Sequence, residues 1–84
     1  MYTYEFVPQA LKELKKLPKD WQRRIIQKLD FFASSKEPLS FAQHLINFEI
    51  GQYRFRIGDY RVIFDLEEET LVVLSVGHRR EIYK

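Results

Sequence analysis

The sequence predicts an α+β domain in which a mostly antiparallel four-stranded sheet carries an N-terminal helical hairpin on one face. Three observations support this class: apolar residues recur at helical spacing in the first third of the chain, later segments alternate as strands do, and a two-residue turn signal separates two of those strands. We expect the order β-α-α-β-β-β. At 84 residues the chain is one small domain, residues 1–84, with a modest core.

Composition narrows the class of protein. The chain is 45% hydrophobic and 31% charged, as soluble globular proteins are. It has no cysteine, which excludes disulfides, thiolate metal sites and cysteine nucleophiles. We find no signal peptide and no apolar run near the ~20 residues that span a bilayer, and therefore expect a cytoplasmic protein without membrane contact. No metal-ligand spacing, Gly-rich phosphate loop or catalytic triad is visible, so no cofactor is predicted.

The first segment alternates over residues 2–6 and predicts a short strand. Pro8 suits the first turn of a helix, where its missing N–H costs nothing. The apolar positions at helical spacing that follow are Ala10, Leu11, Leu14 and Leu17. Pro18 ends this helix.

A second helix follows almost at once, with Asp20 as its candidate N-cap. Its apolar stripe consists of Trp21, Ile25, Leu29 and Phe32. The very short connection predicts that the two helices form an antiparallel hairpin. Basic residues lie mostly off the stripe and are interpreted as a solvated face, or as contacts to phosphate groups of a partner: Lys12, Lys15, Lys16, Arg23, Arg24 and Lys28.

Residues 34–38 read as a loop, and residues 39–47 are compatible with a short helical turn or with irregular structure. The next strand is expected over residues 48–57, with Gly51 as a candidate bulge near its start. Residues 71–74 form an unbroken apolar run, typical of an interior strand that is covered on both faces.

Gly58-Asp59 is a two-residue hairpin signal, and glycine at the first central position suits a type II′ turn. This turn pairs Ile57 with Tyr60 and places Arg56 directly opposite Arg61, with Arg54 on the same face. Like charges that face each other across a ladder are destabilising. The arrangement therefore favours an anionic ligand over a purely structural role for these arginines.

The strand at residues 71–76 is followed by Gly77, His78, Arg79 and Arg80, which add a histidine and two more guanidinium groups. Together with the hairpin arginines, these residues predict a phosphate-binding surface on a sheet.

The element order, the segment YRFRIGDYRVIF at residues 53–64 and the closing VGHRREIY at residues 76–83 resemble the RelE/ParE superfamily of bacterial type II toxins. The resemblance covers nearly the whole chain. It implies a cytoplasmic toxin held inactive by a cognate antitoxin encoded beside it, in a complex that binds operator DNA through the antitoxin. The RelE branch cuts messenger RNA in the ribosomal A site without a metal, whereas the ParE branch inhibits DNA gyrase.

The resemblance also implies site residues. The basic positions of the RelE pattern are matched by Arg54, Arg56, Arg61 and Arg79, and its late tyrosine is matched by Tyr83. The RelE prototype has lysines on the second strand and a longer C-terminal segment. Arginine keeps its proton at ordinary pH, so the prototype's acid–base assignment does not carry over.

Metal-free RNA cleavage needs a base, an acid and cations around the phosphate. The four arginines supply the cations, and His78 is the candidate acid or base because an unperturbed imidazole titrates near neutral pH. Tyr83 would stack on a base or orient a phosphate. The structural alternatives are an exposed strand end for His78 and packing against the sheet edge for Tyr83.

The favoured interpretation is a ribosome-dependent mRNA endoribonuclease, which makes the protein an enzyme. The alternatives are a ParE-like gyrase inhibitor, for which the histidine would be dispensable, and a degenerate toxin-fold protein.

Overall fold

A computed structural model describes residues 1–46 and 49–78. The elements are β1 (Thr3–Phe6), α1 (Pro8–Lys15), α2 (Lys19–Ser34), a 3₁₀-helix (Pro38–Phe41), β2 (Ala42–His44), β3 (Tyr53–Ile57), β4 (Tyr60–Glu67) and β5 (Thr70–His78). The sheet has five strands in the order β1-β5-β4-β3-β2, and β1 runs parallel to β5 while the other neighbours are antiparallel. The predicted α+β class is confirmed and the predicted elements occur in the expected order, but the sheet has five strands and not the predicted four.

The fifth strand, β2, lies in the stretch whose sequence was compatible only with a helical turn or irregular structure. Pro38 starts a single 3₁₀ turn, and the chain then pairs with β3, placing Ala42 opposite Phe55 and His44 opposite Tyr53. A strand of three residues is too short to show the alternation of apolar and polar side chains that identifies strands in a sequence. This strand is therefore recognised only from its pairing with β3.

One of the two predicted helix starts is confirmed, and the other needs a correction. Pro8 occupies the first turn of α1, as predicted. Asp20 is not the N-cap of α2: Pro18 holds that position, and no side chain caps the helix. Asp20 lies instead in the first turn, where its negative charge interacts favourably with the positive end of the helix dipole. Its Oδ1 is 3.8 Å from Arg23 Nη1.

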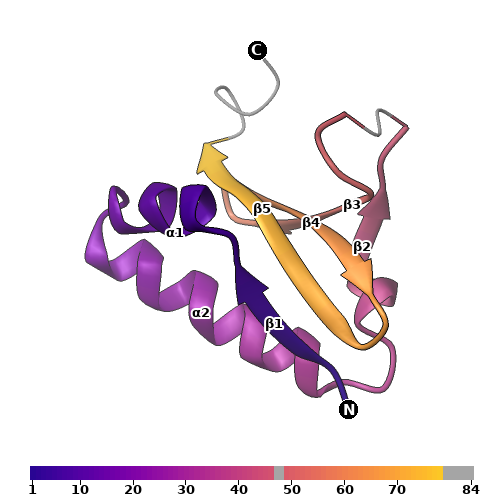
Figure 1. Ribbon diagram of the computed structural model, residues 1–84. Helices are drawn as coiled ribbons and strands as arrows, with labels where there is room; N and C mark the ends of the chain where they lie inside the picture. Colours follow the sequence, from indigo (N-terminus) through magenta and orange to yellow (C-terminus); the bar gives the residue numbers. More distant parts are fainter. Residues whose placement is uncertain (47–48, 79–84) are drawn as a thin grey trace.

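The core fills the space between the two helices and one face of the sheet (Figure 1). The helices contribute Ala10, Leu14, Ile25, Leu29, Phe32 and Ala33, and the strands contribute Phe55, Ile57, Val62, Phe64, Leu71, Val73 and Val76. The alternation of β3 thus turns its apolar side chains toward the helices. β5 is an interior strand, as predicted, and lies between β1 and β4. The prediction that both of its faces are covered is only partly met, because Val72 and Leu74 stay half-buried.

The β3–β4 hairpin has the predicted register, with Ile57 opposite Tyr60 and Arg56 opposite Arg61. Gly58 has φ 61°, while Asp59 is not among the described residues with positive φ, which is the pattern of a type II′ turn. The predicted bulge at Gly51 is wrong, because Gly51 precedes β3. The irregularity lies in the β4–β5 pair: Phe64 is opposite Val73 and Ile63 is opposite Ser75.

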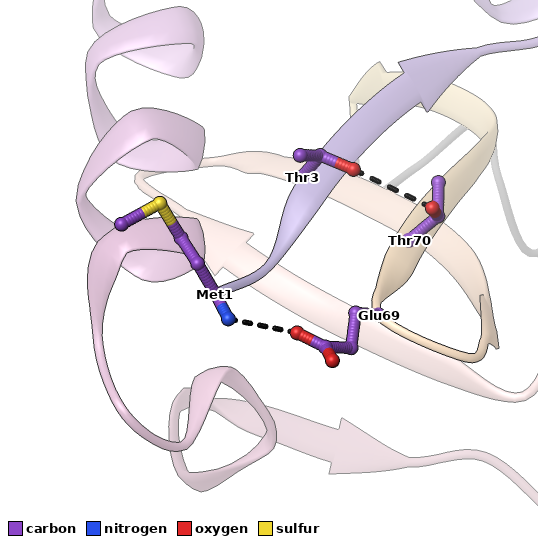
Figure 2. Close-up of polar contacts among 4 residues, drawn as sticks. All are labelled: Met1, Thr3, Glu69 and Thr70. Atoms are coloured by element: carbon purple, nitrogen blue, oxygen red, sulfur yellow. Dashed lines mark hydrogen bonds and ion pairs between the residues drawn. The ribbon is translucent and has the colours of Figure 1, made fainter.

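An ion pair and a hydrogen bond join the start of β1 to the β4–β5 turn. The Met1 amino group lies 2.7 Å from a Glu69 carboxylate oxygen, and the Thr3 and Thr70 hydroxyls are 3.4 Å apart. Figure 2 draws both contacts. The positive amino group lowers the pKa of the Glu69 carboxyl. A residue of β1 also forms a side-chain hydrogen bond with the helical layer.

That residue is Tyr4, whose hydroxyl donates to Asp30 Oδ1 of α2 over 2.6 Å. Burial, followed by the hydrogen bond to Asp30 and the negative charge of its carboxylate, raises the pKa of Tyr4 to about 12. The contact therefore couples β1 to α2 through a phenol that stays protonated at neutral pH.

Candidate functional site

Three arginines share the sheet face opposite the helices, which we call the arginine face: Arg54, Arg56 and Arg61. Because side chains alternate along a strand, Phe55 and Ile57 point to the core and the two arginines of β3 point away from it. Arg61 opposes Arg56, so it lies on the same face. The structure therefore brings these three predicted residues together.

The arginines differ in exposure. Arg56 is exposed, Arg54 is half-buried, and Arg61 is only 6% exposed, with its Nη1 donating to the Tyr60 carbonyl over 3.4 Å. A charged side chain is seldom buried to this degree. Burial immobilises the Arg61 side chain, while Arg56 reaches into solvent beside it.

Arg54 is held by a residue that the sequence analysis did not single out. Gln43 of β2 lies directly opposite Arg54, and Arg54 Nη2 donates to Gln43 Oε1. This contact orients one guanidinium of the arginine face. Gln43 belongs to the stretch without a readable pattern, so its position depends on the pairing of β2 with β3.

Part of the arginine face is covered by the chain that precedes β3. Gly51 has φ 142°, and a Cβ on it would lie 2.5 Å from Ile63 Cγ2, so this close approach needs glycine. Gln52 fastens the segment: its N–H donates to Asp65 Oδ1 over 2.8 Å, and its Oε1 accepts from the Leu66 N–H over 3.0 Å. The cover buries Ile63 completely.

His78 is on the other face of the sheet. It opposes Tyr60, and the two rings meet edge to face with centroids 5.7 Å apart. The cause is the bulge in β5, where one extra residue, Leu74, reverses the alternation. Because of this bulge, Val73 and Val76 both face the core. His78, two residues after Val76, lies on the same face as Val76.

His78 lines a cavity of 640 Å³ on the helix side of the sheet. The other lining residues are Gln9, Glu13, Lys16, Leu17, Pro18, Tyr60, Ser75, Val76 and Gly77. Glu13 Oε1 accepts hydrogen bonds from the Ser75 hydroxyl and the Val76 N–H, both over 3.1 Å. The structure does not place the histidine among the arginines.

Two predicted site residues, Arg79 and Tyr83, lie outside the described residues. Within residues 1–46 and 49–78 we find no group of three or more histidine, aspartate or glutamate side chains arranged to hold a metal ion. Among the helices of these residues, none has the length and apolar character needed to cross a membrane.

The chemistry of the arginine face is suited to a phosphodiester. Arginine forks match phosphate oxygens in pairs of hydrogen bonds, and a fixed guanidinium needs little reorganisation on binding. An anion between Arg56 and Arg61 would also relieve the repulsion between them.

Residues 4–83 match the family model described as the ParE toxin of the type II toxin–antitoxin system parDE. The chain is also 33% identical over 85 residues to Toxin RelG of Mycobacterium tuberculosis, a match that covers 99% of this chain and 97% of RelG. The chain belongs to the RelE/ParE toxin superfamily. It is a toxin of a type II toxin–antitoxin system.

Solved structures agree. The toxin is similar to a chain of the RelBE2 toxin–antitoxin complex from Mycobacterium tuberculosis, with a TM-score of 0.79, 31% identity and coverage of 93% and 98% of the two chains. It is similar to the isolated RelE toxin of E. coli, with a TM-score of 0.73, 26% identity and coverage of 99% and 92%. It is also similar to a chain of the archaeal RelE–RelB complex from Pyrococcus horikoshii, with a TM-score of 0.72, 29% identity and coverage of 95% and 97% of the two chains.

Proposed function

We propose that the toxin is a ribosome-dependent mRNA endoribonuclease that works without a metal and inhibits translation. The observation that carries the proposal is the arginine face, where Arg56 and Arg61 oppose each other and Arg54 lies on the same side. A pair of like charges costs stability unless an anion joins it. Messenger RNA in the ribosomal A site is the anionic partner that we propose.

The reaction uses the ribose 2′-hydroxyl as an internal nucleophile. Its oxygen bonds to the adjacent phosphorus while a base removes its proton, the bond from phosphorus to the 5′-oxygen breaks, and an acid protonates that leaving oxygen. The products are a 2′,3′-cyclic phosphate and a 5′-hydroxyl. The arginines stabilise the negative charge that builds on the phosphate oxygens, and the ribosome aligns the strand.

Arg54, Arg56, Arg61 and Arg79 are the proposed phosphate ligands, and Tyr83 is the proposed stacking residue. His78 remains a proposed acid or base, and its ring lies on the helix side of the sheet. It would have to reach the phosphate around the end of β5, so we assign the larger share of catalysis to the arginines.

We also propose a cognate antitoxin as the partner, with operator DNA bound through the antitoxin and with the cytoplasm as the place of action. Support comes from the relatives, since two of the similar structures are toxin–antitoxin complexes.

The second candidate is a gyrase inhibitor, because the matching family model is that of the ParE toxin. In that case messenger RNAs stay intact, and the supercoiling activity of DNA gyrase falls when the toxin is present. A degenerate toxin-fold protein would produce neither effect.

The test is induced expression in a bacterial host with genome-wide mapping of RNA 5′ ends, together with a gyrase supercoiling assay. We compare wild type with Arg56→Ala and Arg61→Ala, and use the exposed loop residue Lys36 as the control position, changed to Ala. We expect codon-phased cuts within translated messages that both sheet variants lose and the control keeps. Growth arrest with intact messages and inhibited gyrase would support the ParE-like candidate instead.

A further inference from the structure

The sheet ends at β2, the strand beyond β3. Its middle residue, Gln43, pairs with Arg54, whereas its first residue, Ala42, pairs with Phe55 and packs against the core. Because side chains alternate along a strand, Gln43 points to the arginine face. An uncharged amide therefore borders the guanidinium groups of this face.

Contacts on both sides of Gln43 fix the position of its backbone. Before β2, the Phe41 ring stacks on the core residue Phe32 with centroids 5.0 Å apart. After β2, Leu45 is only 9% exposed, and its N–H donates to the Gln52 carbonyl over 2.9 Å. The short edge strand thus holds Gln43 at a defined place beside β3.

The contact between Gln43 and Arg54 suits an arginine that must stay positive. Arg54 Nη2 donates to Gln43 Oε1, and an amide oxygen orients the guanidinium without cancelling its charge. A carboxylate in the same place would form an ion pair and weaken the attraction for phosphate. Arg61 is held by burial, whereas Arg54 is only half-buried. The amide therefore gives Arg54 the fixed orientation that burial gives Arg61.

We infer that Gln43 is a positioning residue for RNA cleavage: it holds the Arg54 guanidinium in the orientation that binds the scissile phosphate, and its neutral side chain leaves the charge of Arg54 intact. A charged group that is oriented before the reaction needs no reorganisation in the transition state. The inference rests on the proposed function in taking RNA as the ligand of the arginine face. The contact itself belongs to the free toxin and can be measured without RNA.

The first test is a double-mutant cycle of single-turnover cleavage on programmed ribosomes, with wild type, Gln43→Leu, Arg54→Ala and the double variant. We expect Gln43→Leu to lower the rate at saturating toxin about tenfold, but less than about twofold in the Arg54→Ala background, because Gln43 acts through Arg54. The toxin concentration that gives half of the maximal rate should stay within about twofold, since binding to the ribosome is unchanged.

Gln43→Glu separates orientation from charge. Its carboxylate can still accept the hydrogen bond from Arg54 but cancels the positive charge, so we expect the rate to fall about tenfold or more. The matched controls are Thr3→Leu and Thr3→Glu, which change an exposed residue of the opposite edge strand, β1. Both should cleave within about twofold of wild type. Urea unfolding verifies that every variant is folded.

A second readout reports on the orientation of Arg54 directly. NMR relaxation of the arginine Nε–H groups measures their mobility in the free toxin, and the Arg54 signal is assigned by its absence from Arg54→Lys. We expect the order parameter of Arg54 to fall in Gln43→Leu and to be retained in Gln43→Glu.

The outcomes separate this role from a structural one. Equal losses from Gln43→Leu in both backgrounds would overturn the inference, because Gln43 would then only stabilise the sheet edge. An unchanged Arg54 order parameter in Gln43→Leu would overturn it as well, as would a fully active Gln43→Glu toxin. A wild-type toxin that leaves ribosome-bound messages intact would reject the nuclease and this role together, whereas wild type and Gln43→Leu toxins of equal activity would reject this role alone.

Discussion

Arg56 lies directly opposite Arg61 across the β3–β4 hairpin, and one of the two is exposed while the other is only 6% exposed. The exposed guanidinium can meet a ligand, whereas the buried one is held by its surroundings. Their mutual repulsion lowers the stability of the free toxin, and a bound phosphate offsets that cost. This pair connects the fold to the proposed chemistry.

The pair predicts a trade-off between stability and activity at Arg56. Arg56→Thr removes the repulsion and places a β-branched residue on a strand, so we expect the free energy of unfolding to rise by about 0.2–1 kcal/mol. Because the same change removes a phosphate ligand, RNA cleavage should fall roughly 10²–10³-fold. Urea unfolding and a ribosome cleavage assay measure the two effects. Lys36→Thr, in an exposed position, is the control for an exposed cation, and a less stable Arg56→Thr toxin would contradict the argument.

The position of His78 predicts a small catalytic contribution. Loss of a true general acid or base costs roughly 10²–10⁴-fold, but this ring packs against Tyr60 on the helix side of the sheet, so we expect less than about a tenfold loss for His78→Ala. Single-turnover cleavage on programmed ribosomes, followed from pH 5 to pH 8, gives the rate and its pH profile. A loss above a hundredfold, with the acid limb of the profile removed, would return the proton-transfer role to His78.

The close approach of Gly51 predicts a large effect of a single methyl group. Gly51→Ala combines a positive φ with a Cβ placed 2.5 Å from Ile63 Cγ2, and we expect the free energy of unfolding to fall by about 1–3 kcal/mol. The Ile63 side chain is the nearest obstacle. The double variant Gly51→Ala/Ile63→Ala, which lacks Cγ2, should therefore recover part of the loss relative to the sum of the single variants, as a double-mutant cycle of denaturant unfolding would show. Strict additivity would mean that backbone strain alone causes the effect.

The Tyr4–Asp30 contact predicts a stability loss at alkaline pH. The pKa of Tyr4 is raised from 10.0 to about 12 in the folded toxin, so the contribution of this group is complete below pH 10 and is lost as the pH rises from 10 through about 12. Thermal unfolding of wild type across this range should therefore decline more steeply than that of Tyr4→Phe. At neutral pH, Tyr4→Phe should cost about 1 kcal/mol for the missing hydrogen bond. Parallel alkaline profiles for the two proteins would show that the contact does not couple to folding.

Local sequence signals predicted much of this fold. The β3–β4 hairpin was correct in turn type and register because Gly58 and the alternation of β3 are determined within a few residues. The strand β2 and the contact between Gln43 and Arg54 were not predictable, since both depend on a neighbour about ten residues further along the chain. The prediction of Asp20 as the N-cap was wrong because Pro18, two residues earlier, holds that position and the helix begins at Lys19.

The sequence by itself determined the order of the elements other than β2, and the side of β3 that carries Arg54 and Arg56, because strand alternation is a property of the local backbone. Tertiary structure decided the burial of Arg61 and the face on which His78 lies. The physical reason for the face of His78 is the extra residue in β5: one inserted residue moves every later side chain to the opposite face, and only pairing with β4 reveals where the insertion falls.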